Sequence, residues 1–162
     1  MRNMMMLAGL GLLAACGGGS KEPTQREQIG QVWKYRDAGQ GAKLAYLGSA
    51  NTVQTMTAPD TFSVLLIQPM SNGEKDVTVK LVGAPFHCDL SDCAVTAVTD
   101  DGKTHRWHGR MADTNDGIEI KPSEKAYEAI ARSKSVKINL AVGAKDESFP
   151  FEFTVAGLNL KG

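Results

Sequence analysis

The stretch Ala94-Val-Thr-Ala-Val-Thr-Asp-Asp-Gly-Lys-Thr-His-Arg-Trp-His-Gly-Arg110 decides the fold, because it has the pattern of two strands joined by a turn. Apolar and polar side chains alternate on both sides of Asp101-Gly102, which is the period of a half-buried strand. Gly102 tolerates a positive φ, and Asp-Gly is a typical pair for a tight two-residue turn. We therefore expect residues 94–99 and 103–110 to pair as an antiparallel hairpin.

The same two-residue period recurs over most of the remaining chain, between turn residues such as Asn72-Gly73. One run, residues 62–67, is apolar on both faces and is therefore expected to be a central strand. The sum is about eight or nine short strands, which favours an all-β fold, either an antiparallel β-sandwich or a partly open barrel. The other expected strands cover residues 32–36, 43–47, 77–81, 118–120, 134–142 and 149–155.

One helix is expected at about residues 123–132, in the C-terminal half of the chain. Ser123 is the expected N-cap residue, and Glu124 lies in the first turn, where a negative charge is favourable. The side chains expected to face the core are those of Tyr127, Ile130 and Ala131.

The first residues have the pattern of an export signal. Arg2 supplies a positive charge, residues 4–13 form an apolar run, and small residues precede Cys16. About ten apolar residues reach only about half of a bilayer core, which takes roughly 20 helical residues, so this segment is expected to be removed rather than to cross a membrane. The stretch Leu13-Ala14-Ala15-Cys16 resembles the lipobox of bacterial lipoproteins.

The resemblance implies that residues 1–15 are a lipoprotein signal peptide, and that Cys16 becomes the lipidated first residue of the mature chain. Several acyl chains hold a domain stably on a membrane, whereas a single chain gives only marginal binding. Gly17 is not the aspartate that retains members of this family at the inner membrane. The resemblance therefore implies an outer-membrane protein whose domain faces the periplasm, with the membrane bound through the lipid at Cys16.

Residues 16–28 have three glycines and a serine directly after Cys16 and lack apolar periodicity, which favours a flexible, lipidated tether. Residues 29–162, about 130 in number, are the size of a single β-sandwich domain. The 18 basic residues fall to 17 when Arg2 leaves with the signal peptide, against 18 acidic residues. This balance gives no reason to expect a nucleic-acid partner.

Cys88 and Cys93 are the other two of the three cysteines, and an export signal places them in an oxidising compartment. We expect a disulfide that pins the connection between the strands near 77–82 and 94–99. A redox-active pair and a metal site remain open as alternatives. The two cysteines are spaced C-x4-C, which is wider than the C-x2-C of zinc sites. His105 and His108 are expected to point to opposite faces of one strand. No metal site is therefore assigned. The side chains weighed for it are His87, Asp89, Asp92, His105 and His108.

Arg106, His108 and Arg110 fall on one face of the expected strand at 103–110, with His105 and Trp107 on the other. Such a cationic strip could bind phosphate, lipopolysaccharide or an acidic glycan. The simpler interpretation is an amphipathic strand with Trp107 in the core and a solvated basic face.

A second resemblance covers about residues 60–160. Phe86-x-Cys88-x4-Cys93-x-Val95, Asp101-Gly102 and Phe151-x-Phe153-x-Val155-x-Gly157-Leu158 are similar to a pattern in exported bacterial proteins of unassigned activity. It implies a stable β domain with a disulfide and no site residues.

The motifs of common hydrolases, zinc enzymes and P-loop proteins are absent from the sequence, and no catalytic residue or cofactor is assigned. We therefore expect a non-enzymatic outer-membrane lipoprotein that binds a partner protein or another envelope component through a loop or a sheet edge. One alternative is a protective or inhibitory lipoprotein that acts against a hydrolase, a phage or a toxin. Another is a ligand carrier or a hydrolase, which would need a sizeable apolar pocket.

Overall fold

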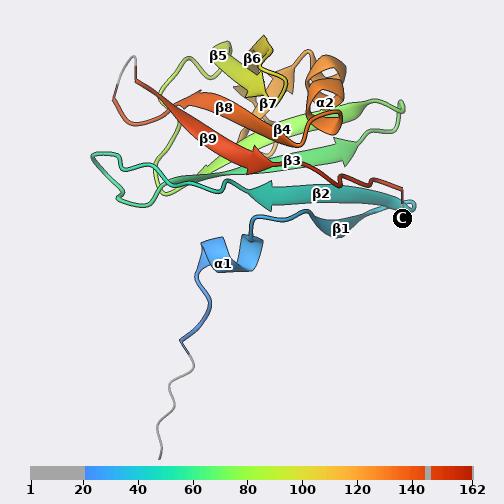
Figure 1. Cartoon of the computed structure of the whole chain (residues 1–162), viewed down its shortest axis with the longest axis horizontal. Coiled ribbons are helices and arrows are strands. Elements are labelled where there is room, and N and C mark those ends of the chain that lie inside the picture. The colour runs from blue at the N-terminus through green and yellow to red at the C-terminus, as the bar shows by residue number, and fades with distance from the viewer. Residues whose placement is uncertain (1–20, 145–146, 162) are drawn as a thin grey trace, which may run out of the picture.

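The computed structural model describes residues 21–144 and 147–161 (Figure 1). Nine strands form one antiparallel sheet in the order β1-β2-β3-β4-β7-β6-β5-β8-β9, and a helix lies in the C-terminal half, which confirms the all-β prediction. The elements are α1 (Gln25–Ile29), β1 (Lys34–Gly39), β2 (Ala42–Gly48), β3 (Phe62–Pro69), β4 (Lys75–Val82), β5 (Cys93–Thr99), β6 (Thr104–Met111), β7 (Ile118–Lys121), α2 (Ser123–Ala131), β8 (Ser135–Ala141) and β9 (Ser148–Thr154).

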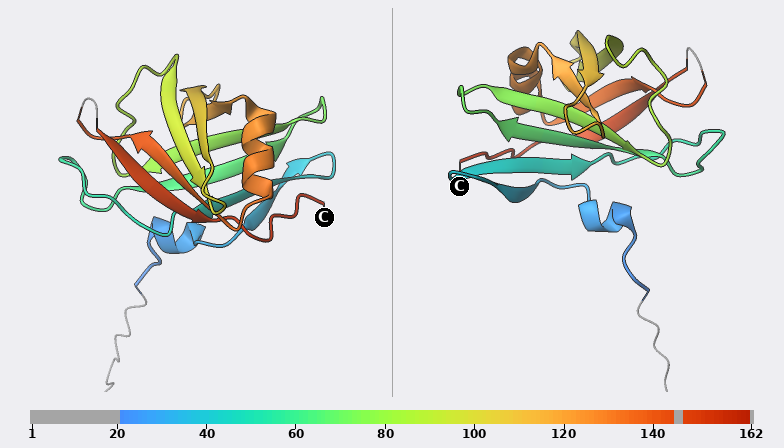
Figure 2. Two further views of the ribbon diagram at one scale, coloured as in Figure 1. Left: turned by 45° about the horizontal axis from the view of Figure 1, so that its top comes forward. Right: turned by 180° about the vertical axis from the view of Figure 1, so that it is seen from behind.

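All nine strands belong to one sheet that bends over a common core, and the sheet is not closed into a barrel (Figure 2). The gap between the edge strands β1 and β9 is bridged by other hydrogen bonds. The Trp33 indole N–H donates to the Val155 carbonyl at 2.8 Å, and the Asn159 N–H donates to the Tyr35 hydroxyl at 2.9 Å. A third hydrogen bond reaches β9 from the segment after β2, because the Asn51 side-chain amide donates to the Pro150 carbonyl at 2.8 Å.

The core consists of the inward-facing side chains of the strands. Residues alternate between buried and exposed positions along β5, β6, β8 and β9, as the period in the sequence predicts. In the strand expected at residues 149–155, Phe151 and Phe153 are buried, whereas Phe149 is half-buried against the core. The largest fully buried side chains also include Leu47, Leu65, Ile67, Ile118, Ile120, Ile130, Ile138 and Leu140.

The hairpin expected on either side of Asp101-Gly102 is confirmed by the pairing of β5 with β6. Its turn has three residues, 100–102, instead of the expected two, because the Thr99 N–H donates to the Lys103 carbonyl at 3.1 Å. Gly102 takes a positive φ of 79°, which fits a three-residue turn that ends in a left-handed residue. The Thr99 hydroxyl donates to the Asp101 carboxylate at 2.6 Å and so closes the turn.

The N-cap residue of helix α2 lies one position before the expected one. Pro122 is the N-cap residue and Ser123 the first helical residue, so the prediction of Ser123 as N-cap is wrong. The Ser123 hydroxyl instead donates to the Ile120 carbonyl at 3.2 Å. The helix packs on β4 and β7 through Ala126 and Ile130, which lie four residues apart on one face.

Two of the three side chains predicted to face the core from α2 do so. Ile130 is buried and Tyr127 is half-buried against the core. Ala131 is exposed, because one further residue turns the helix by about 100° away from Ile130.

The expected flexible tether, residues 16–28, overlaps the helix α1. Thr24 and Glu27 form a capping box, a signal that does not depend on apolar periodicity. The Gly48 N–H donates to the Gly30 carbonyl at 2.8 Å, and Arg26 donates to the Ala50 carbonyl at 2.6 Å, so α1 is fixed on the end of β2. The signal peptide and the lipidation site Cys16 lie outside the described residues.

Asp101→Asn is expected to lower the free energy of unfolding at neutral pH and to have less effect in acid. The pKa of the Asp101 carboxyl lies well below its ordinary value, because the Thr99 hydroxyl and Lys103 donate hydrogen bonds to the charged form. A depressed folded-state pKa stabilises the protein above about pH 4, the unfolded value, and this stabilisation is lost as the pH falls. Urea unfolding of both proteins over a pH series checks this, and a constant difference between them would contradict it.

Candidate binding surfaces

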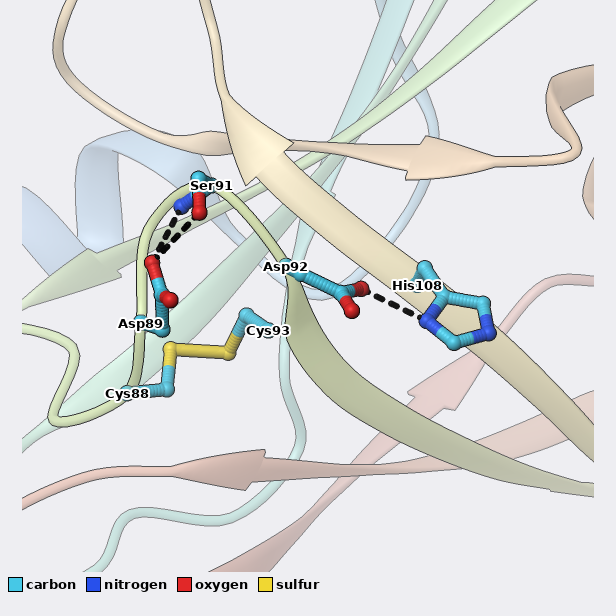
Figure 3. The surroundings of a disulfide bond; sticks show 6 residues. All are labelled: Cys88, Asp89, Ser91, Asp92, Cys93 and His108. Carbon is cyan, nitrogen blue, oxygen red and sulfur yellow. Dashed lines mark hydrogen bonds and ion pairs between the residues drawn. A yellow bond between two sulfur atoms is a disulfide. The ribbon is translucent and has the colours of Figure 1, made fainter.

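A disulfide joins Cys88 and Cys93, whose Cα atoms are 5.4 Å apart, which confirms the predicted pairing (Figure 3). The closed loop spans the end of β5, between its neighbours β6 and β8. The Leu90 carbonyl accepts from the Met111 N–H at 2.7 Å, and the His87 N–H donates to the Ala141 carbonyl at 2.9 Å. The disulfide therefore fixes a loop that connects the ends of two strands.

Carboxylates lie next to both cysteines in the sequence. Asp89 accepts hydrogen bonds from the Ser91 hydroxyl at 2.7 Å and from the Ser91 N–H at 2.9 Å, and these lower the pKa of its carboxyl. Asp92 pairs with His108 Nδ1 at 2.7 Å, and both side chains are about two-thirds exposed (Figure 3). Negative charges beside a cysteine disfavour the thiolate, so the surroundings do not support the alternative of a redox-active pair.

The alternative of a metal site finds no cluster to support it. In the part of the chain that the structure describes, no three His, Cys, Asp or Glu side chains are grouped so that they would hold a metal ion. His105 and His108 lie on opposite faces of β6, as expected.

The structure brings the predicted cationic residues Arg106, His108 and Arg110 together on the outer face of β6, and Trp107 is buried on the inner face. Two of the three are paired with acids. Arg110 donates to Glu119 at 3.1 Å, and His108 contacts Asp92. Arg106 makes no hydrogen bond or ion pair among the described residues. The binding role of this strip stays a prediction. Two of its three side chains already have acidic partners within the domain.

His105, on the inner face of β6, lines a polar cavity of about 350 Å³ between α2 and the β5–β6 turn. Its ring stacks on Trp107 at 5.6 Å, and its Nε2 lies 3.2 Å from the Thr99 hydroxyl. That hydroxyl is nearly fully buried and donates to Asp101. This chain of contacts holds the turn, and it leaves the Thr99 hydroxyl neither exposed nor free to act as a nucleophile.

A second surface, which the sequence did not predict as a site, lies on the outer face of the other half of the sheet. It is a groove of about 370 Å³, named here the β2–β3 groove, and Gln25 and Ile29 of α1 line part of it. The sequence feature that could have indicated this surface is the run at 62–67, in which the outward side chains are apolar as well as the inward ones. The groove is lined by Gln25, Ile29, Arg36, Leu44, Tyr46, Val64, Leu66, Lys80, Leu81, Val82 and Asp116.

The two cations of the β2–β3 groove differ in their surroundings. Lys80 forms an ion pair with Asp116, and this contact lowers the pKa of the Asp116 carboxyl. Arg36 lies over the ring of Tyr46, with its guanidinium carbon 5.8 Å from the ring centre. Within residues 21–144 and 147–161, its guanidinium makes no hydrogen bond or ion pair.

Neither helix in the described residues has the length and hydropathy needed to cross a bilayer. No protein family matches the chain, and no curated protein matches it. The chain is similar to a crystal structure of invasion associated protein b from Bartonella henselae, with 18% identity, coverage of 76% of this chain and 81% of that chain, and a TM-score of 0.45. At this identity and TM-score the similarity carries no argument about function.

Replacement of both cysteines, Cys88→Ser with Cys93→Ser, is expected to lower the free energy of unfolding by about 2 kcal/mol, because the open loop gains entropy in the unfolded chain. Urea unfolding of the two proteins measures this. Alkylation before reduction, followed by mass spectrometry of the peptides that contain the two cysteines, is the companion test. Labelling of both thiols in the unreduced protein would show that the pair is not a disulfide in solution.

Proposed function

We propose that this chain is an outer-membrane lipoprotein whose β domain faces the periplasm and binds an envelope protein without catalysing a reaction. The observation that carries the proposal is Leu13-Ala14-Ala15-Cys16, at the end of a short apolar run and before a glycine-rich segment. Acylation at Cys16 would hold the domain on the membrane. A disulfide in the folded domain is consistent with an oxidising compartment.

The electrostatics of the described residues support binding rather than acid–base catalysis. Each carboxyl with a resolved pKa shift has its pKa lowered by hydrogen bonds, so it stays ionised at neutral pH: Glu27, Asp89, Asp101 and Asp116. A carboxyl that acts as a general acid or base near pH 7 needs a pKa shifted toward that pH instead. These groups hold turns and caps together.

The tether sets how far the domain can stand from the membrane. Seven residues lie between Cys16 and Thr24, the cap of α1, so the two are eight steps apart along the chain, and a fully extended chain spans about 3.3–3.6 Å per residue. The start of α1 would then lie no more than roughly 30 Å from the lipidated residue. A partner should therefore be another component at or near the same membrane.

The anchor is tested by metabolic labelling with a clickable fatty acid. Wild-type protein should incorporate the label, and Cys16→Ala should not, because the acylated sulfur is absent. The matched control is Cys88→Ser with Cys93→Ser, which should be labelled like the wild type. Equal labelling of Cys16→Ala and wild type would contradict lipidation at this residue.

The binding role is tested by crosslinking in intact cells. The full chain should recover a specific envelope protein, whereas residues 1–23 fused to an unrelated folded domain should not, because the fusion carries the anchor but not the β domain. If both recover the same proteins at equal yield, the domain has no partner of its own under those conditions and the proposal fails.

A further inference from the structure

The outer face of the sheet has two halves of different polarity. On β6, β5 and β8 most outward side chains are polar, such as Arg106, Thr96 and Asn139, and the apolar exceptions are Ala94, Val98 and Ala141. On β2 and β3 the outward side chains are Leu44, Tyr46, Val64 and Leu66, which form the floor of the β2–β3 groove. Exposed apolar surface rimmed by polar residues marks an interaction site more often than a solvated face.

The described chain covers only part of this floor. Val64 is buried, and Ile29 of α1 packs over the end of β2, where a Cβ at Gly48 would lie 3.3 Å from it. Leu44, Tyr46 and Leu66 remain half-exposed. The uncovered part includes side chains from two neighbouring strands, Leu44 and Tyr46 on β2 and Leu66 on β3.

The charged side chains at the rim of the groove favour a negatively charged ligand group. Lys80 is already neutralised by Asp116, whereas Arg36 is exposed and has no acidic partner in the described residues. Its position over Tyr46 limits the freedom of the side chain and keeps the guanidinium beside the groove, which both residues line. A guanidinium held in this way suits a carboxylate, which it can bind through two parallel hydrogen bonds.

We propose that the β2–β3 groove binds a segment of an envelope protein that places apolar side chains on Leu44, Tyr46 and Leu66 and a carboxylate against Arg36. This inference rests on the proposed function, since it names the surface through which the anchored domain binds its partner. A protein segment fits better than an acyl chain, because the groove is rimmed by the Lys80–Asp116 pair and the amide of Gln25. An apolar centre with a polar rim is the usual arrangement of a protein interface.

The test places a photo-crosslinking benzoylphenylalanine at Tyr46 in the full, lipidated chain and irradiates intact cells. An aromatic replacement keeps the ring beneath Arg36. The control position is His108, which is exposed on the outer face of β6. We expect a protein adduct at residue 46 and not at residue 108, and the crosslinked peptide should carry apolar residues and an Asp or Glu within a few positions.

Arg36→Glu should reduce the adduct at residue 46 by about tenfold, which corresponds to about 1.4 kcal/mol. The matched control, Arg106→Glu, reverses another exposed arginine, which lies outside the groove and has no acidic partner among the described residues, and it should leave the yield unchanged. Replacement of the mapped carboxylate by lysine in the partner should restore the yield with Arg36→Glu. Circular dichroism of each variant checks that the fold is retained.

Four results would overturn the inference: no adduct at residue 46, a lipid adduct there, equal adducts at residues 46 and 108, or a yield unaffected by Arg36→Glu. Fatty-acid labelling of Cys16 in the same cells separates this failure from failure of the proposed function. A labelled chain without the specific adduct leaves the anchor intact and rejects only the groove.

Discussion

The burial of one face of a single sheet is the constraint on which the rest of this structure depends. Nine strands share one core, and the largest buried side chains come from strands at both ends of the sheet, such as Leu47 on β2 and Phe151 on β9. A flat sheet would leave these side chains in water, so the sheet must bend until its two ends face one another. The edges then meet without pairing, and Trp33 and Asn51 satisfy backbone carbonyls that a closed ladder would otherwise bond.

The bend also determines what the outer face presents. Where β4, β7 and β6 lie side by side, acidic and basic side chains become neighbours and neutralise one another, as Arg110 and Glu119 do. On β2 and β3 the outward positions are apolar, and the short helix α1 covers only one end of them. These apolar outward positions agree with the central place of β3 in the sheet, and they are the ones that the proposed binding surface would use.

Much of the fold could be predicted from local pattern, and much of the site could not. The period-two runs, the turn at Gly102 and the Cys88–Cys93 pair depend on neighbours in the sequence, and all three were predicted, although the turn is one residue longer. The groove depends on the strand order, which brings residue 116 beside residue 80 and α1 beside β2. The periodicity of a sequence does not show which residues far apart in the chain come into contact. The same limit applies to the cationic strip, because its neutralisation by Glu119 follows from the pairing of β6 with β7. The capping box at Thr24 was a local signal that the glycine-rich composition before it concealed.

The attachment of α1 to the end of β2 has a mechanical consequence. Under the proposed lipidation at Cys16, any pull on the domain would pass through the N-terminal segment, and the first hydrogen bonds to carry that load would be those from Arg26 to Ala50 and from Gly48 to Gly30. They lie ahead of the edge strand β1 in the chain, so α1 would detach before the sheet begins to open. Detachment would lengthen the tether between the bilayer and the domain by a few residues while the nine strands stay folded. It would also remove one wall of the groove, so that tension at the membrane and occupancy of that surface would be coupled.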